Sequence, residues 1–429
     1  MTKKQVAFYI AGLGILIAIA VAVVELFLLP PNTVDIAAGP KGTYLYETAQ
    51  KYAQEFEKAG VKVNVIETNG TLENIALVNH DSKNIEFAFI EGGAANSANY
   101  PNLESLGSIV YAPIWVFYRS KLGTIRDIND LKGKRIALGF ITQGVHNNAT
   151  HILSAVGITA QNSQFFDLGR KDALKALQAN KIDAMFTSAP AEDPLIKKLF
   201  NSPNVSVLNW PDAEGISRNM REFHVLTLPM GTIDLINNKP VNNMNLLATT
   251  FTVVAQKETY SALIYLMMGI MVDVHQSPSF LHAENEFPAD RDVDFPLSDV
   301  AEDYYKKGGK PFLQRYLPYW AASFVGKLLI ILLPLLAIVI PVSQTYAPIQ
   351  FWYYNRIVGR FYRQLVKIEK KFEPGEPSEI TKNKLEKLRI EVEYIVRLEK
   401  FPGNYSYLIY DFRSHLDDAI ERYGFKQDI

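Results

Sequence analysis

The chain has 429 residues, of which 48% are hydrophobic and 21% are charged, and its formal net charge is -1 at pH 7. This length predicts about two to four domains, and the near-neutral charge gives no support for nucleic-acid binding, which leaves a basic footprint. The absence of cysteine excludes disulfides, thiol catalysis, thiolate metal sites and a lipid-modified amino-terminal cysteine. His146 and His151 miss the i, i+4 spacing that puts two metal ligands on one helix face. We therefore expect no metal and no cofactor.

The amino-terminal segment predicts a membrane anchor. Lys3 and Lys4 precede an apolar run over residues 6–29, which is long enough to cross a bilayer. The run continues directly into Pro30-Pro31, whereas a secretory signal has a shorter core and a small-residue cleavage site. We expect an uncleaved anchor over residues 1–31, and removal as a signal peptide is the alternative.

Strands and helices alternate between Asp35 and Gly93. The pattern predicts strands over 35–38, 61–66 and 85–90, one helix from Leu45 to a stop at Gly60, and a second helix from Thr71, placed to cap it, to Val78.

The polar loops 39–44 and 68–71 of this region are candidate ligand contacts. They follow predicted parallel strands, and open α/β sheets bind ligands at the carboxyl ends of their strands. Helix N-termini at that edge carry free N–H groups and favour a carboxylate or another small anion. The alternative is that Gly42 and Gly70 serve only as turn glycines.

A second alternating set follows a strand-rich run over 106–119, in which Pro113 predicts a bend or a crossing between lobes. Further strands are predicted over 135–138, 165–168, 182–187, 205–210, 224–228 and 248–255, with helices over 144–156, 170–180, 188–200 and 258–274. Two sets of this kind predict an α/β fold of two lobes with a ligand cleft between them.

At these residues the chain resembles a known family. Gly39–Tyr44, Thr68–Asn74 and Phe87–Ile90 resemble the first lobe of TAXI-type solute receptors, the binding components of one class of TRAP transporters; Leu131–Gly139 and Ala176–Ala184 resemble the second lobe, and Pro296–Lys306 the closing segment. The resemblance covers about 33–310 and extends to a subgroup with a C-terminal anchor. It implies a two-lobed, periplasmic-binding-protein-like fold of the second type that closes on a small, often carboxylate-bearing ligand and works with a membrane permease. The turns 39–42 and 141–144 depart from the glycine-rich loops usual in the family, so ligand identity is not carried over.

On that fold, the expected cleft residues are polar side chains and turn backbone from both lobes, because hydroxyls, amides and N–H groups suit carboxylate oxygens. The expected ligand-binding residues are Gly42, Thr43, Tyr44, Asn69, Gly70, Thr71 and Asn74 from the first lobe, Thr142, Gln143 and Ser188 from the second, and Trp115 near the hinge. For Trp115 the alternative is a place in the core, and for Asn74 it is a solvated helix position. Arg119, Arg135 and Arg170 are three cations of which any one could face the cleft.

A second membrane segment is predicted over 318–345. Tyr316, Tyr319 and Trp320 precede the apolar core 328–340, and a basic excess from Arg356 to Lys371 follows it. The positive-inside rule then makes both termini cytoplasmic and residues 32–317 extracytoplasmic, at a bacterial inner membrane. A buried core helix is the alternative for this segment.

These segments divide the chain as follows: lobe 1 over 32–112 and 226–317, lobe 2 over 113–225, and a cytoplasmic helical tail over 346–429 with helices at 349–372, 378–400 and 405–423. For the basic side of the tail, contact with anionic lipid is weighed against a protein partner.

Two functions remain open from the sequence. The first is a membrane-tethered receptor that captures a small, organic acid-like solute and hands it to a permease. The second is a sensor or scaffold whose outer domain binds a ligand or protein and whose tail docks inside. No Ser/His/Asp or paired-carboxylate constellation points to an enzyme.

Overall fold

The computed structural model describes residues 31–79, 85–95, 97–309, 316–317, 319–370, 378–399, 401 and 403–424. The chain forms two compact units, Met1–Lys327 and Leu328–Ile429. The predicted first anchor lies outside the described residues except for Pro31.

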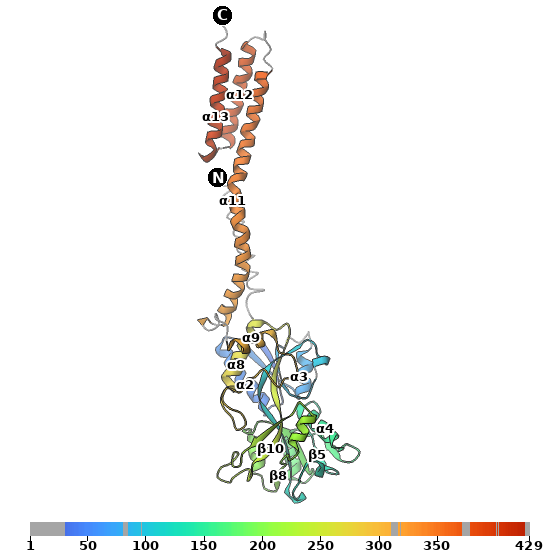
Figure 1. Ribbon diagram of the computed structural model, residues 1–429. Helices are drawn as coiled ribbons and strands as arrows, with labels where there is room; N and C mark the ends of the chain where they lie inside the picture. The colour runs from blue at the N-terminus through green and yellow to red at the C-terminus, as the bar shows by residue number, and fades with distance from the viewer. Residues whose placement is uncertain are drawn as a thin grey trace. The chain divides into compact units, whose positions relative to one another are not determined.

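The first unit alternates strands and helices along the chain (Figure 1). Its first part contains β1 (Thr33–Gly39), α2 (Tyr44–Lys58), β2 (Lys62–Glu67), α3 (Thr71–Val78) and β3 (Phe87–Glu91). The middle contains β4 (Leu103–Arg119), β5 (Arg135–Ala137), α4 (Gly144–Ala155), β6 (Gln164–Phe166), α5 (Arg170–Gln178), β7 (Ala184–Ser188), α6 (Pro194–Phe200), β8 (Val205–Val207), α7 (Ala213–Asn219) and β9 (His224–Leu228). The last part contains β10 (Met244–Gln256), α8 (Ser261–His275) and α9 (Asp299–Lys307).

Two long strands, β4 and β10, join the lobes. The strand order is β2-β1-β3-β10-β4-β7-β5-β6, with β8 paired to β4 and β9 paired to β10. The β4 strand pairs with β10 as far as Pro113, opposite Ala248, and pairs with β7 from Ile114 onward, opposite Ser188. The strand therefore runs through Pro113 without a break, and its partners change from the first lobe to the second at that residue.

The first lobe has a hydrophobic layer on each face of its sheet, because successive side chains of a strand point to opposite faces. Phe87 and Phe89 of β3 pack toward α2, α8 and α9, whereas Ala88 and Ile90 pack toward α3. Figure 1 shows α2, α8 and α9 on one side of this sheet and α3 on the other. The strand β3 is thus buried on both faces, as strands of parallel sheets usually are, whereas the edge strand β2 is only partly buried.

The second lobe repeats this arrangement around the far half of β4. Ile114 and Val116 pack in one cluster with α4 and α7, while Trp115 and Phe117 pack in another with α5 and α6. The start of β10 and strand β9 also contribute to these two clusters. The expected α/β fold of two lobes, each with hydrophobic clusters of its own, is confirmed.

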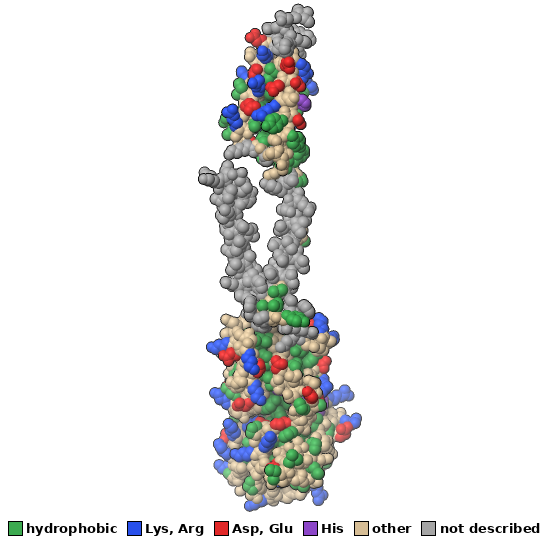
Figure 2. All heavy atoms as spheres, turned by 90° about the vertical axis from the view of Figure 1, so that its left-hand side faces the viewer, with side chains coloured by type: hydrophobic (Ala, Val, Ile, Leu, Met, Phe, Trp, Pro, Cys, Tyr) green, Lys and Arg blue, Asp and Glu red, His purple; other side chains and the backbone are tan. Residues whose placement is uncertain are grey.

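The second unit has a helical core of its own. It is built from the end of α11 (Tyr319–Lys370), α12 (Ser378–Glu399) and α13 (Ser406–Gly424), and Val358, Phe361, Leu388 and Phe412 are buried in it. Charged side chains of both signs are interspersed on its visible face (Figure 2). Within the described part of the chain, no helix combines the length and the apolar character that crossing a membrane requires.

Candidate functional site

A cavity of about 60 Å³ lies between the two lobes. Residues from the carboxyl ends of the strands and from the first turns of the following helices surround it, which is the edge where open α/β sheets bind ligands. The lining residues are Ala38, Gly39, Pro40, Thr43, Tyr44, Leu45, Gly70, Thr71, Asn74, Glu91, Gly139, Gln143, Gly144, Val145, Arg170, Phe186, Thr187, Ser188 and Phe251.

The first turns of α2, α3 and α4 all contribute to this lining. A helix N-terminus carries unpaired N–H groups and a partial positive charge, so it favours an anion. Two of these N-termini belong to the first lobe and one to the second. The cavity therefore has donor groups on both sides, with the aromatic rings of Tyr44 and Phe251 stacked at 5.9 Å on the first-lobe side.

Glu91, at the end of β3 in the first lobe, is held by donors of the second lobe. The Ser188 hydroxyl donates to Oε2 at 2.7 Å, and the Asn148 side-chain amide donates to Oε1 at 3.2 Å. The backbone N–H of Val145, in the first turn of α4, is a further donor to this carboxyl group. We call Glu91, Val145, Asn148 and Ser188 the Glu91 cluster.

The Glu91 carboxyl group is buried, with 4% of the residue exposed. Burial raises its pKa from the ordinary 4.5 to about 7, because desolvation disfavours the charged form; the donors from Ser188, Asn148 and Val145 oppose this shift. None of the three is a cation. This acid is therefore stabilised by neutral hydrogen-bond donors alone within the cluster.

The lobes also touch each other directly at the mouth of the cavity. The N–H of Leu72 donates to the carbonyl of Thr142 at 3.0 Å, and the Thr142 hydroxyl donates to the carbonyl of Asn69 at 2.9 Å. Gly70, at φ 136°, lies so close to the second lobe that a Cβ there would be 3.0 Å from the Thr142 carbonyl oxygen. These contacts correspond to a closed arrangement of the two lobes.

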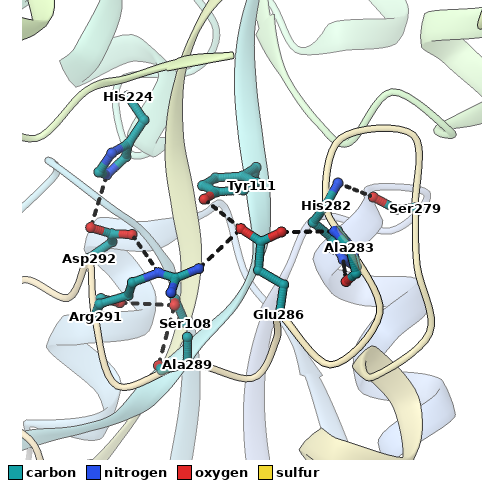
Figure 3. A network of polar contacts seen from close by, with 10 residues as sticks. All are labelled: Ser108, Tyr111, His224, Ser279, His282, Ala283, Glu286, Ala289, Arg291 and Asp292. Atoms are coloured by element: carbon teal, nitrogen blue, oxygen red, sulfur yellow. Dashed lines mark hydrogen bonds and ion pairs between the residues drawn. The ribbon is translucent and has the colours of Figure 1, made fainter. Parts of the chain in front are cut away.

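A loop of the first lobe spans the hinge on the connecting strands (Figure 3). Glu286 accepts from the Tyr111 hydroxyl of β4 at 2.9 Å and pairs with Arg291 at 3.1 Å. Asp292 pairs with His224 of β9 at 3.2 Å, which ties the loop to a strand of the second lobe. This network braces the hinge outside the cavity.

Several residues predicted for the first lobe do line the cavity, but their side chains are already used within the lobe. The Thr43 hydroxyl donates to the Pro40 carbonyl at 2.7 Å and caps α2. Asn74 is fully buried and donates to the Phe89 carbonyl at 2.7 Å, so it is not the solvated residue of the alternative. Tyr44 lines the cavity, and burial raises its pKa to about 12.

Three first-lobe expectations need correction. Thr71 is not the cap of α3: Gly70 occupies that position, and the Thr71 hydroxyl accepts from the N–H of Glu91 at 3.1 Å. Gly42 and Asn69 are exposed and lie outside the cavity lining. The Asn69 side chain instead donates to Glu73 at 2.8 Å.

In the second lobe, Gln143 and Ser188 line the cavity, whereas Thr142 contacts the first lobe at its rim. Trp115 does not line the cavity: it is fully buried in the lobe core, which was the alternative for this residue. It alternates with Ile114 and Val116 and therefore points to the opposite face, where its ring N–H donates to the Ala189 carbonyl at 2.8 Å.

Of the three arginines considered, only Arg170 lines the cavity, where it pairs with the buried Asp193. Arg119 and Arg135 both pair with Asp183 elsewhere in the second lobe. Sequence reasoning missed Glu91 and Asn148. A signal for Glu91 was present, since an acid directly follows the apolar strand 85–90 and precedes two glycines.

The site, as far as the structure describes it, shows no sign of a metal centre, and most of the first unit matches a known protein family. Among the residues that the structure describes, no group of three or more His, Asp or Glu side chains could hold a metal ion. A family model described as the NMT1-like family matches residues 36–309.

Three solved structures that are similar to part of the chain match it with TM-scores from 0.36 to 0.44. A protein from Bordetella bronchiseptica RB50 matches with a TM-score of 0.44 and 15% identity, covering 65% of this chain and 99% of that one. The MOPS-bound alkanesulfonate-binding protein SsuA from Xanthomonas axonopodis pv. citri matches with a TM-score of 0.36 and 16% identity, covering 57% and 73%. The L-arginine-bound substrate-binding protein AbpA of an amino acid ABC transporter from Streptococcus pneumoniae matches with a TM-score of 0.37 and 14% identity, covering 57% and 90%. Because the family model covers more than half of the sequence, the chain belongs to the NMT1-like family.

Proposed function

We propose that this protein is a solute-binding receptor that captures a small molecule between its two lobes. The observation that carries the proposal is the cavity between the lobes at the carboxyl ends of the strands, where N-termini of helices from both lobes meet. Lobe closure around a ligand is a hinge motion, and the strands β4 and β10 provide the two connections about which the lobes could rotate.

The finer assignment is a membrane-tethered receptor of a TRAP-like transport system, of the TAXI type, facing the extracytoplasmic side. The apolar runs over 6–29 and 328–340 and the basic excess after the second run support this part of the proposal. Tethering would raise the effective concentration of the receptor near a permease. For the solute we propose a small, carboxylate-bearing molecule, because the N-termini of α2 and α3 favour the binding of an anion.

The direct test is a thermal-shift screen of the full-length protein in detergent against small carboxylates, amines and neutral polar solutes, followed by calorimetry on each hit. We expect saturable binding that is lost in Leu45→Trp, since Leu45 lines the cavity and a larger ring would fill it. The matched control is Leu235→Trp, because Leu235 is 85% exposed outside the cavity lining. Absence of binding across the screen, or equal binding by both variants, would contradict the receptor function.

Membrane tethering and the permease need a separate test. We expect the full-length protein to stay in the membrane fraction after alkaline carbonate washing, and affinity purification from native membranes to recover a protein with many membrane spans. Release by carbonate would contradict the tether.

A sensor or scaffold is the second candidate, and the separate helical core of the second unit favours it. Trp352 and Tyr394 are 60% and 64% exposed there, beside Arg356 and Arg360 in one open groove. Recovery of a signalling protein and no permease in the same affinity purification would favour this candidate over transport.

A further inference from the structure

The second-lobe side of the cavity is already occupied by a carboxyl group of the chain itself. Glu91 comes from the first lobe, yet its donors Val145, Asn148 and Ser188 all belong to the second. These donors, at the N-terminus of α4 and the carboxyl end of β7, form the place where a solute carboxylate would be expected to bind.

The fit around Glu91 is close. A Cβ on Gly144, the first residue of α4, would lie 2.5 Å from the Glu91 Cβ and 2.9 Å from its Oε2. Glycine at this position therefore allows the glutamate side chain to approach the helix N-terminus. Asn148 is fully buried and also donates to the Gly92 carbonyl at 3.0 Å, which fixes its amide beside the carboxyl group.

We propose that Glu91 is a built-in ligand of the second lobe: it fills the anion subsite at the α4 N-terminus, excludes external carboxylates from it, and closes the two lobes on the chain's own side chain. This inference rests on the proposed function. It gives the solute-binding cavity two different ends: one in the second lobe, which Glu91 fills, and one in the first lobe, which stays open to the solute. Of the three helix N-termini described above, those of α2 and α3 in the first lobe then remain for a solute anion, and the guanidinium of Arg170, which also lines the cavity, is already paired with Asp193. The end of the solute that faces the second lobe carries a hydrogen-bond donor, such as an ammonium or hydroxyl group, which a carboxylate oxygen of Glu91 accepts.

Removing the side chain should open the subsite to a small external carboxylate. Glu91→Ala deletes a methylene and a carboxylate, which together match acetate in size. We expect acetate, at pH 8 and with ionic strength held constant by chloride, to raise the unfolding midpoint of full-length Glu91→Ala in a saturable way. In calorimetry its affinity should be at least tenfold higher than for the wild type.

The matched control is Glu91→Gln, whose amide fills the same space and should leave acetate without effect. The double variant Glu91→Ala, Ser188→Ala should bind acetate several-fold more weakly than Glu91→Ala, since it lacks one of the donors. Equal acetate shifts in wild type, Glu91→Gln and Glu91→Ala, or no shift in any of them, would overturn the proposal.

Glu91→Ala could also fail to fold in plain buffer. Recovery of folded protein with acetate but not with matched chloride would then support the subsite, and failure with both would overturn it. The acetate result does not depend on the natural solute. A solute screen without hits beside a positive acetate result rejects only the receptor function, whereas a confirmed solute beside acetate-insensitive Glu91→Ala rejects only the role of Glu91.

Discussion

The two ends of strand β7 hold two buried carboxyl groups in opposite ways. Asp183, directly before the strand, pairs with Arg119 and Arg135. Although burial acts to raise its pKa, hydrogen bonds from Arg135 and Arg119 hold the pKa of Asp183 below its usual range. Ser188, the last residue of the strand, instead donates to Glu91, whose pKa burial raises to about 7.

This difference fits a structural role for Asp183 and the binding role that we propose for the cavity at Glu91. An acid paired with cations stays charged and holds neighbouring strands together. An acid surrounded by neutral donors costs free energy to bury and gains no charge pairing in return. Strongly perturbed pKa values of the second kind are characteristic of functional clefts, and Glu91 lies in the cavity whereas Asp183 does not.

The largest expected effect is on the pH dependence of stability, measured with Glu91→Gln. The pKa of Glu91 is about 7 in the folded state and 4.5 ordinarily, so the folded protein binds a proton more tightly than the unfolded one. The contribution of Glu91 to the unfolding free energy should therefore fall by about 3 kcal/mol as pH rises from 4.5 to 7, then level off. Denaturant titrations between pH 5 and 8 should show most of this fall as a change in the difference between wild type and Glu91→Gln.

Subtracting the two curves removes the contributions of His275 and Asp294. Burial lowers the pKa of His275 to about 3, so it adds stability as pH rises from 3 to 6.5. Burial raises the pKa of Asp294 to about 6, so it removes stability as pH rises from 3.8 to 6. Both residues are present in both proteins, so their contributions to the unfolding free energy cancel in the difference. Parallel curves for wild type and Glu91→Gln would show that Glu91 titrates normally, and the contrast with Asp183 would disappear.

Asp183→Asn tests the other end of β7. The change leaves Arg119 and Arg135 without their carboxylate partner, and their side chains are only 18% and 34% exposed. We expect a loss of about 2 kcal/mol in unfolding free energy at pH 7, discounted for partial solvent screening. Because the pKa of Asp183 is depressed, its stabilisation is present above pH 3.8 and is lost as pH falls further, so the variant should approach the wild type in acid.

An exposed carboxylate provides the control for Asp183. Asp172 pairs with Lys175 three residues later, and these side chains are 64% and 77% exposed. Asp172→Asn should change the unfolding free energy by less than about 0.5 kcal/mol. Equal effects of the two substitutions would mean that burial and double pairing add nothing at Asp183.

Much of this fold was predictable because its signals are local. The apolar alternation of 85–90 and the helical period after Tyr44 each depend on a few neighbouring residues, and β3 and α2 form where these patterns predict them. The return of the chain to the first lobe was harder to locate. Met244, Leu246 and Leu247 of β10 pack in the second lobe while Phe251 and Val253 pack in the first, and a continuous apolar strand gives no sign of that change.

The site was less predictable because it joins distant parts of the chain. Ser188 and Asn148 lie 97 and 57 residues beyond Glu91, so its donors cannot be inferred from its neighbours in the sequence. The prediction for Trp115 failed for a local reason. Successive residues of β4 point to opposite faces, and both faces are packed: Ile114 and Val116 lie in one hydrophobic cluster and Trp115 in the other. Thr43 was correctly predicted to line the cavity, but its role as the cap of α2 depends on the backbone geometry of the loop, which the sequence does not give.

The smallest expected effect comes from Gly144→Ala, which tests how closely the Glu91 side chain approaches α4. The added methyl group would lie 2.5 Å from the Glu91 Cβ, so the carboxyl group must move away from the helix N-terminus. We expect a loss of about 1 kcal/mol in unfolding free energy from overpacking. The loss should shrink when Glu91 is also changed to glycine, because alanine at position 91 would keep the Cβ that makes the shortest contact. Gly215→Ala is the control, since a Cβ there meets nothing within 4 Å, and alanine in helix α7 should be neutral or stabilising by up to about 1 kcal/mol. Additive effects of Gly144→Ala and Glu91→Gly would mean that the approach of Glu91 to the α4 N-terminus does not depend on glycine at position 144, and the close fit that sets this end of β7 apart from the Asp183 end would be lost.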